Sequence, residues 1–146
     1  KASKCLLVLM HMQGNPQTMQ KEPKYNFAPR DIYYFLKKKI MKCEKNGIKK
    51  NRIIIDPGIG FGKTSKHNIQ ILQNLRIFHK LGCNILIGLS RKRFISDLSK
   101  KEEPIDRIPG TIAANQYALE QGVDIIRVHD VKEALQAKLI WQALKK

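Results

Sequence analysis

Residues 52–63 read RIIIDPGIGFGK, a β-branched apolar run that leads directly into a polar, glycine-rich loop. Two further apolar runs end in the same way: residues 84–87 (NILI) precede Ser90-Arg91-Lys92, and residues 124–128 (DIIRV) precede His129-Asp130. Each run follows a glycine that ends a helical stretch. Parallel strands carry their chemistry at their carboxyl ends. We therefore expect these polar groups to converge at one rim of a parallel sheet.

The rest of the chain repeats a strand, a loop and a helix. We expect strands over residues 5–10, 52–55, 84–87 and 124–128, and helices from 29 to 46 and over 66–81, 109–121 and 131–144. The first strand is apolar throughout, which is typical of a strand buried on both faces. Ser90 is predicted to cap a following helix with its hydroxyl.

Four strand-helix units joined by right-handed crossovers predict an α/β fold with four parallel strands alternating with helices. Such a chain forms either half of a (β/α)8 barrel or a small doubly wound sheet. The glycines before the strands, at 47, 82 and 122, favour the barrel because every unit then carries its polar groups at the same strand end.

The composition suits one globular domain of 146 residues with 42% hydrophobic content. The longest apolar run, residues 5–10, is far shorter than the roughly 20 residues that cross a bilayer, so we expect no membrane partner. No secretory signal is recognisable at the start, and the first residue, Lys1, suggests a natural start further upstream. The three cysteines lack metal or redox spacing; we expect them to be buried in a protein of the reducing cytoplasm.

A formal charge of +16 leaves a nucleic-acid-binding protein open as an alternative. Most lysines are scattered over predicted helix faces and ends, however, which favours a solvated surface. We therefore expect no nucleic-acid partner, and the charge is equally compatible with small anionic substrates.

Four strand-end residues have side chains suited to ligand binding. Asp56 can accept paired N–H bonds from a flat, amidine-like heterocycle edge, or it can simply close a turn. Phe61, between two glycines, either stacks on an aromatic ligand or folds back onto the core. Arg127 and His129 lie two apart at a strand end and together favour anion binding, with a purely structural histidine as the alternative.

Four motifs together resemble the dihydropteroate synthase family: VLMHMQG (8–14), the loop 56–63, SRK (90–92) and RVHD (127–130). The resemblance runs in order over essentially the whole chain. It implies a (β/α)8 TIM barrel that joins 6-hydroxymethyl-7,8-dihydropterin diphosphate to p-aminobenzoate, giving 7,8-dihydropteroate and pyrophosphate for folate synthesis. Residues 1–146 then form a single pterin-binding barrel domain that is only the C-terminal half, without the first four strand-helix units. We expect this fragment alone to be inactive.

The resemblance assigns catalytic roles to four residues of this sequence. Asp56 is similar to the carboxylate that holds the pterin, and Lys92 to the lysine that contacts the pterin ring and borders the aminobenzoate. Arg127 and His129 resemble the residues that grip the diphosphate.

Substrate-binding roles follow for four more residues. Met10 and Gly88 are expected to line the pterin slot, and Phe61 to stack near the aminobenzoate. Arg93 stands where many relatives carry a serine that helps to bind the aminobenzoate carboxylate; an arginine there could serve the same anion.

The family further implies Mg²⁺ bound with the diphosphate, no metal ligand within this segment, a homodimer formed through the C-terminal helices, and inhibition by sulfonamides. Two other functions stay open. One is a pterin-dependent methyltransferase of the same superfamily, which has no use for a diphosphate grip. The other is a basic, non-catalytic nucleic-acid-binding fragment.

Overall fold

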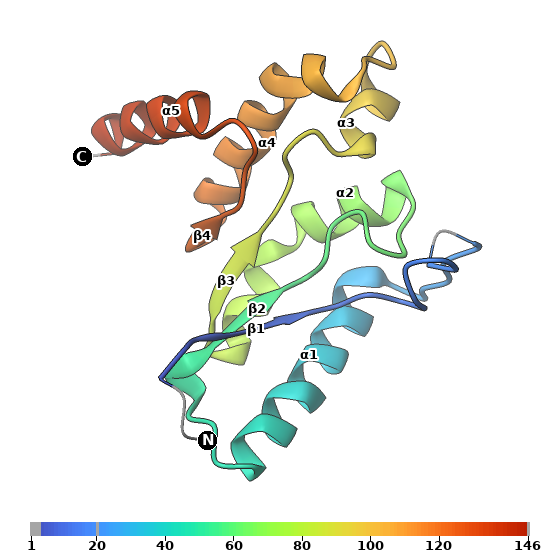
Figure 1. The fold of residues 1–146 in the computed structure, drawn as a ribbon, viewed down its shortest axis with the longest axis vertical. Coiled ribbons are helices and arrows are strands. Elements are labelled where there is room, and N and C mark those ends of the chain that lie inside the picture. The colour runs from blue at the N-terminus through green and yellow to red at the C-terminus, as the bar shows by residue number, and fades with distance from the viewer. Residues whose placement is uncertain (1–3, 20, 146) are drawn as a thin grey trace.

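The computed structural model describes residues 4–19 and 21–145, and four parallel strands form its sheet in the order β1-β2-β3-β4 (Figure 1). Met10 lies opposite Asp56, and Ile87 lies opposite Ile126. Because all neighbouring strands are parallel, their carboxyl ends form one rim, as the sequence predicts. The strands are β1 (Leu7–Met10), β2 (Ile53–Asp56), β3 (Asn84–Ile87) and β4 (Ile125–Ile126).

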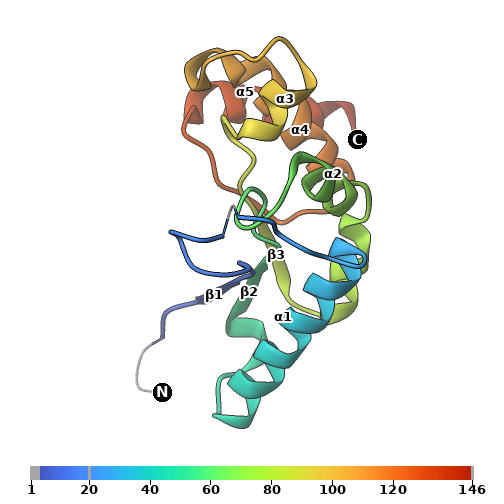
Figure 2. The same cartoon turned by 90° about the vertical axis from the view of Figure 1, so that its right-hand side faces the viewer.

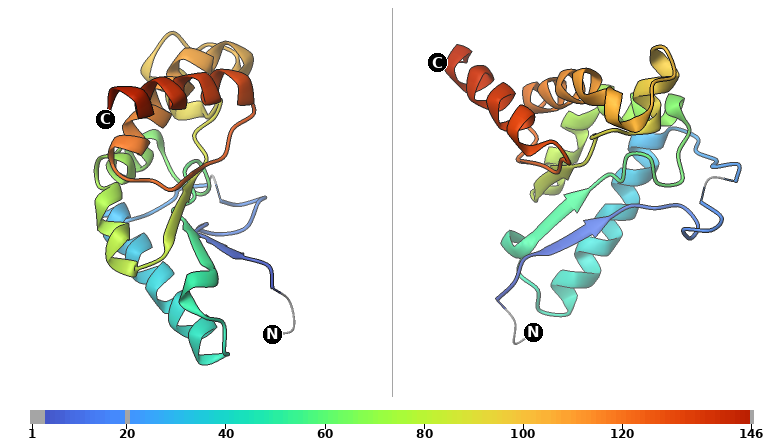
Figure 3. Two further views of the ribbon diagram at one scale, coloured as in Figure 1. Left: turned by 90° about the vertical axis from the view of Figure 1, so that its left-hand side faces the viewer. Right: turned by 45° about the horizontal axis from the view of Figure 1, so that its top comes forward.

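Helices follow each strand. α1 and α2 cover one face of the strands (Figure 2), and α4 packs against α5 beyond β4 (Figure 3). The α-helices are α1 (Ala28–Lys45), α2 (Ser65–Gln73), α3 (Arg93–Leu98), α4 (Ile108–Glu120) and α5 (Val131–Leu144). Short 3₁₀ helices are η1 (Lys50–Arg52), η2 (Leu75–Leu81) and η3 (Pro104–Arg107).

The core lies between the sheet and α1, α2 and η2. Ile32 and Leu36 of α1 are fully buried, as are Ile55 of β2, Ile85 of β3 and Phe78 of η2. Buried residues recur in α1 at a spacing of four, which is the spacing of one helix face. Burying a large apolar side chain stabilises a fold by about 1.5–3 kcal/mol. This core therefore holds the strands in place, and with them the rim.

The first strand is not buried on both faces, contrary to the sequence prediction. Leu6 is 60% and Val8 is 45% exposed. β1 pairs only with β2 and stands at the edge of the described sheet, and helices cover one face of that sheet. The prediction that all three cysteines are buried is also wrong: Cys5 is exposed, while Cys43 in α1 and Cys83 before β3 are half-buried.

Two further local predictions are wrong. The expected helix over 66–81 is interrupted at Asn74, whose side-chain amide donates to the Gln70 carbonyl and whose backbone leaves the helical region. Ser90 does not cap a helix, because α3 begins at Arg93 with Lys92 in the capping position. Arg91 adopts a left-handed backbone with φ of 58°, which separates Ser90 from the helix.

Within the described residues, none of the helices combines the length and the apolar character that crossing a membrane requires.

Candidate active site at the strand rim

Asp56 ends β2 and is the buried carboxylate of the rim. It is 3% exposed, and its Oδ1 accepts a 2.7 Å hydrogen bond from the Gly58 backbone N–H. Burial raises the pKa of Asp56, while the Gly58 N–H, Lys92 and Arg127 act in the opposite direction. The carboxylate thus interacts with three cations: Lys92 and Arg127, which come from two other loops, and Lys63, which ends its own loop. It can accept hydrogen bonds from a ligand in surroundings that strengthen them.

The loop after Asp56 packs directly against the chain that follows β1. Gly58 has φ of 72°, and a Cβ placed on it would lie 1.9 Å from the His11 carbonyl oxygen and 3.4 Å from Met10 Cγ. Only glycine fits both this backbone conformation and this contact. Met10, half-buried beside Asp56 in the register, therefore reaches the same part of the rim.

Lys92 approaches the glycine-rich loop from the chain that follows β3. Its Nζ donates to the Ile59 carbonyl and lies 4.6 Å from the centroid of the Phe61 ring. Burial lowers the pKa of Lys92 to about 8; Asp56 opposes this shift and Arg127 adds to it. Phe61 is half-buried and packs on a cation rather than in the main core, which leaves part of the ring accessible to a ligand.

Arg127 follows β4 and reaches across the end of β3. Its Nη2 would lie 3.0 Å from a Cβ on Gly88, so the absence of a side chain at Gly88 leaves room for the guanidinium. Arg127 affects the pKa of both Asp56 and Lys92. The structure thus brings together Asp56, Lys92 and Arg127, which lie far apart in the sequence.

His129 lies further along the rim, beside Ser90. Its Nδ1 is 2.9 Å from Ser90 Oγ, and its backbone N–H donates to the same oxygen. The neighbouring Arg91 and Asp130 form an ion pair in which Arg91 Nε donates to Asp130 Oδ2 at 3.0 Å. This hydrogen bond lowers the pKa of Asp130 and raises that of Arg91. Both contacts fasten the loop after β4 to the loop after β3.

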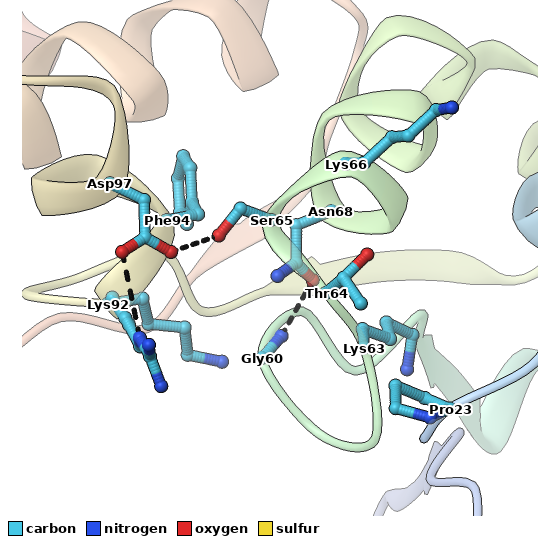
Figure 4. Close-up of a pocket in the computed structure, with 11 residues that line it drawn as sticks. Pro23, Gly60, Lys63, Thr64, Ser65, Lys66, Asn68, Lys92, Phe94 and Asp97 are labelled. Atoms are coloured by element: carbon cyan, nitrogen blue, oxygen red, sulfur yellow. Dashed lines mark hydrogen bonds and ion pairs between the residues drawn. The ribbon is translucent and has the colours of Figure 1, made fainter. Parts of the chain in front are cut away.

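A cavity of about 620 Å³ opens beside the glycine-rich loop (Figure 4). Arg93 lines it, but its side chain is 89% exposed and its Nε lies 3.6 Å from Asp97. Arg93 is thus placed next to Lys92 without joining the cluster around Asp56. The cavity is large enough for a small aromatic molecule. Its other lining residues include Pro23, Gly60, Lys63, Thr64, Ser65, Asn68 and Phe94.

Sequence reasoning gave no individual role to two buried polar residues of this site. His11 is 6% and Lys63 is 4% exposed, and their side chains meet at 3.0 Å. The ion pair of Arg91 and Asp130 was also missed. One sequence signal could have pointed to Lys63: it directly follows three alternating glycines. Glycines offer few side-chain contacts, so such a loop needs a larger neighbouring side chain to hold its shape.

The four parallel strands, with Asp56, Lys92 and Arg127 brought together at their carboxyl ends, define a strand-helix protein with a polar site at one rim of its sheet. The family model described as "Pterin binding enzyme" matches residues 1–129, and the chain belongs to this family.

Relatives within this family share both sequence and fold with the chain. Dihydropteroate synthase of Escherichia coli strain K12 is 43% identical over 135 residues, which cover 92% of this chain and 48% of that protein. The Yersinia pestis dihydropteroate synthase, solved as a sulfonamide drug complex, superposes with a TM-score of 0.92 at 41% identity and covers 96% of this chain and 51% of the other. For the Xanthomonas albilineans dihydropteroate synthase in complex with 7,8-dihydropteroate, the TM-score is 0.88 at 39% identity, with 96% and 50% covered.

The chain spans about half the length of the relatives that it matches. Its four parallel strands and their helices correspond to part of the TIM barrel that these enzymes form.

Proposed function

We propose that this chain supplies half of the active site of a dihydropteroate synthase, which condenses 6-hydroxymethyl-7,8-dihydropterin diphosphate with p-aminobenzoate. The observation that carries the proposal is the meeting of buried Asp56 with Lys92 and Arg127 at one rim. A pterin offers the adjacent N–H groups that a carboxylate binds in pairs, and a diphosphate offers the charge that an arginine binds. The named ligands of the Yersinia and Xanthomonas relatives support this substrate class.

The proposed reaction needs no nucleophile from the protein. Asp56 holds the pterin edge while Met10 and Gly88 border the ring. The bond between the pterin methylene and the diphosphate breaks, positive charge spreads over the ring, and pyrophosphate leaves. The aniline nitrogen then attacks the methylene and loses a proton.

Cations placed where charge develops are the main contribution of this chain to catalysis. Arg127 and His129 are the proposed partners of the leaving pyrophosphate. Lys92 and Phe61 together form the proposed boundary between the pterin and the aminobenzoate, and Arg93 is the residue proposed for the aminobenzoate carboxylate.

We propose Mg²⁺ only as an ion that is bound to the diphosphate of the substrate. Among the residues that the structure describes, no group of three or more His, Cys, Asp or Glu side chains is arranged to hold a metal ion. The buried carboxylate, Asp56, already accepts from Gly58 and faces cations. These residues do not fit a resident Mg²⁺ site, and no catalytic step of this chain is assigned to the ion.

An assay of pyrophosphate release tests the proposed reaction. The full natural chain that carries these residues, given the pterin diphosphate and p-aminobenzoate, is expected to release one pyrophosphate for each dihydropteroate formed. Methyl transfer from methyltetrahydrofolate without pyrophosphate release would instead identify the related methyltransferase. Steeply salt-dependent binding to arbitrary duplex DNA, with no response to pterins, would replace both enzymes by a nucleic-acid-binding function.

We further propose a homodimer formed through α4 and α5, in a cytoplasmic protein. Large apolar side chains of α5 are 51–83% exposed, which is typical of a surface that another protein covers. The exposed residues are Val131, Leu135, Leu139, Ile140 and Leu144. Cys43 and Cys83 form no disulfide among the described residues, which supports the proposed reducing compartment.

Leu139→Glu is expected to weaken the dimer by at least about tenfold, because burying one large apolar side chain is worth about 1.5–3 kcal/mol. Analytical ultracentrifugation over a concentration series measures the dissociation constant. Leu98→Glu on α3, a residue that is also 64% exposed, is the matched control and should leave the constant unchanged. Equal weakening by both variants would argue against an interface at α5.

A further inference from the structure

Lys63 is buried at the end of the glycine-rich loop and has no role in the chemistry proposed above. Its Nζ lies 3.0 Å from His11 Nδ1 and donates to the carbonyls of Gly58 and Phe61, each at 2.8 Å. An ammonium has three N–H donors, and these three groups can each accept one. Lys63 therefore joins both ends of the loop 58–61 to the residue that follows β1.

These acceptors, and the His11 carbonyl oxygen at 3.5 Å from Nζ, carry no formal charge, so burying the ammonium here costs desolvation energy. Burial lowers the pKa of Lys63 to about 7, against the attraction of Asp56. Burial, followed by the charge of Lys63, lowers the pKa of His11 to about 3, so that its imidazole stays neutral and can accept at Nδ1. The desolvation cost of this ammonium is offset only by the hydrogen bonds that it donates to the loop and to His11. What the lysine contributes is thus the fixed position of these acceptors.

The two carbonyls that Lys63 holds belong to residues that each contact a member of the proposed site. The Gly58 backbone N–H donates to Asp56, while the Gly58 carbonyl accepts from Lys63. The Phe61 carbonyl accepts from Lys63, while its ring lies against Lys92. In Figure 4, Lys63 and Lys92 approach the loop from opposite sides of Gly60.

We propose that Lys63 is a positioning residue, whose ammonium fixes the loop 58–61 so that Asp56 and Phe61 keep the geometry that substrate binding requires. This inference rests on the proposed synthase function. Lys63 touches no reacting atom in it and acts only through the loop.

Lys63→Met, which keeps the length of the side chain and removes its donors, tests the inference in the full natural chain. Per folded molecule, kcat is expected to fall about 10- to 100-fold and the KM for aminobenzoate to rise about tenfold, since a displacement of about 1 Å in a positioned site can cost about 100-fold. Lys80→Met, at an exposed lysine of η2, is the matched control and should change neither constant. A purely structural role would reduce the amount of folded enzyme and leave KM unchanged, and that result overturns the inference.

A second pair of variants keeps the test decisive if Lys63→Met does not fold. His11→Leu removes one acceptor of the ammonium, whereas His11→Asn retains an oxygen that can accept. A raised KM in the leucine variant, restored in the asparagine variant, supports the inference; an unchanged KM in a folded His11→Leu variant overturns it.

Amide hydrogen exchange without substrates separates this inference from the proposed function. Loss of protection confined to residues 58–62 in Lys63→Met supports the role of Lys63, even if the wild-type chain releases no pyrophosphate and the synthase proposal fails. Equal protection of the loop in both proteins overturns the role of Lys63, whatever the activity.

Discussion

Asp56→Asn is expected to lower the affinity for a pterin-site ligand by at least about 100-fold. Two charge-assisted hydrogen bonds from the carboxylate are worth about 1.5–3 kcal/mol each, and every 1.4 kcal/mol corresponds to a factor of ten. An asparagine presents only one oxygen and places an N–H donor against the donors of the ligand. Isothermal titration calorimetry on the full natural chain measures the change.

The fold should survive this substitution, because the asparagine oxygen can still accept from the Gly58 N–H. Asp106→Asn, at an exposed carboxylate of η3, controls for the loss of one negative charge and should leave the affinity unchanged. The affinity of the wild-type chain for the pterin-site ligand is also expected to fall as the pH is lowered. Burial raises the pKa of Asp56, so binding weakens as acidification protonates the carboxylate, at a higher pH than for an ordinary aspartate. Unchanged affinity in the Asp56 variant would reject the assigned role.

Gly58→Ala is expected to destabilise the fold by about 2–5 kcal/mol. A left-handed backbone costs a non-glycine residue about 1–2 kcal/mol, and overpacking a rigid site costs about a further 1–3 kcal/mol. The added methyl would meet the His11 carbonyl oxygen at 1.9 Å, and that backbone is held by its hydrogen bond to β2. Urea denaturation gives the free energy of unfolding.

Gly82→Ala separates the two contributions. Gly82 has a similar φ of 66°, but its Cβ would lie 3.4 Å from the flexible end of Lys50. We expect this control to lose only the backbone contribution, about 1–2 kcal/mol. Similar losses in both variants would mean that the loop can move away from the chain after β1, which would also weaken the role given to Lys63.

Local patterns were sufficient for the main elements and for the convergence of the polar groups. The isoleucines before Asp56 form β2, and the apolar spacing of α1 predicts its buried face. Parallel strands leave their carboxyl ends on one side, so Asp56, Lys92 and Arg127 meet once the strands pair in order. The helices and strands follow from the spacing of apolar residues along the chain. The convergence of the three side chains follows from the parallel direction of neighbouring strands that are joined by crossover helices.

The errors arose where a neighbour far away in the sequence decided the outcome. Val8 is exposed because helices cover only one face of the described sheet, and the hydroxyl of Ser90 bonds to His129 rather than to a helix start. Neither effect leaves a trace in the local residue pattern.

The sequence by itself determined the strands, most of the helices, the glycine-rich loop and the charges available at the rim, because these follow from residue spacing within a few turns or strand lengths. Only the tertiary structure decided that Lys63 is buried and that His11 is its partner. These residues are 52 positions apart. The parallel register sets Met10 opposite Asp56, and this places the next residue, His11, beside the loop that ends at Lys63. The acceptors of a buried ammonium are the groups that pack around it, and tertiary packing alone decides which groups these are.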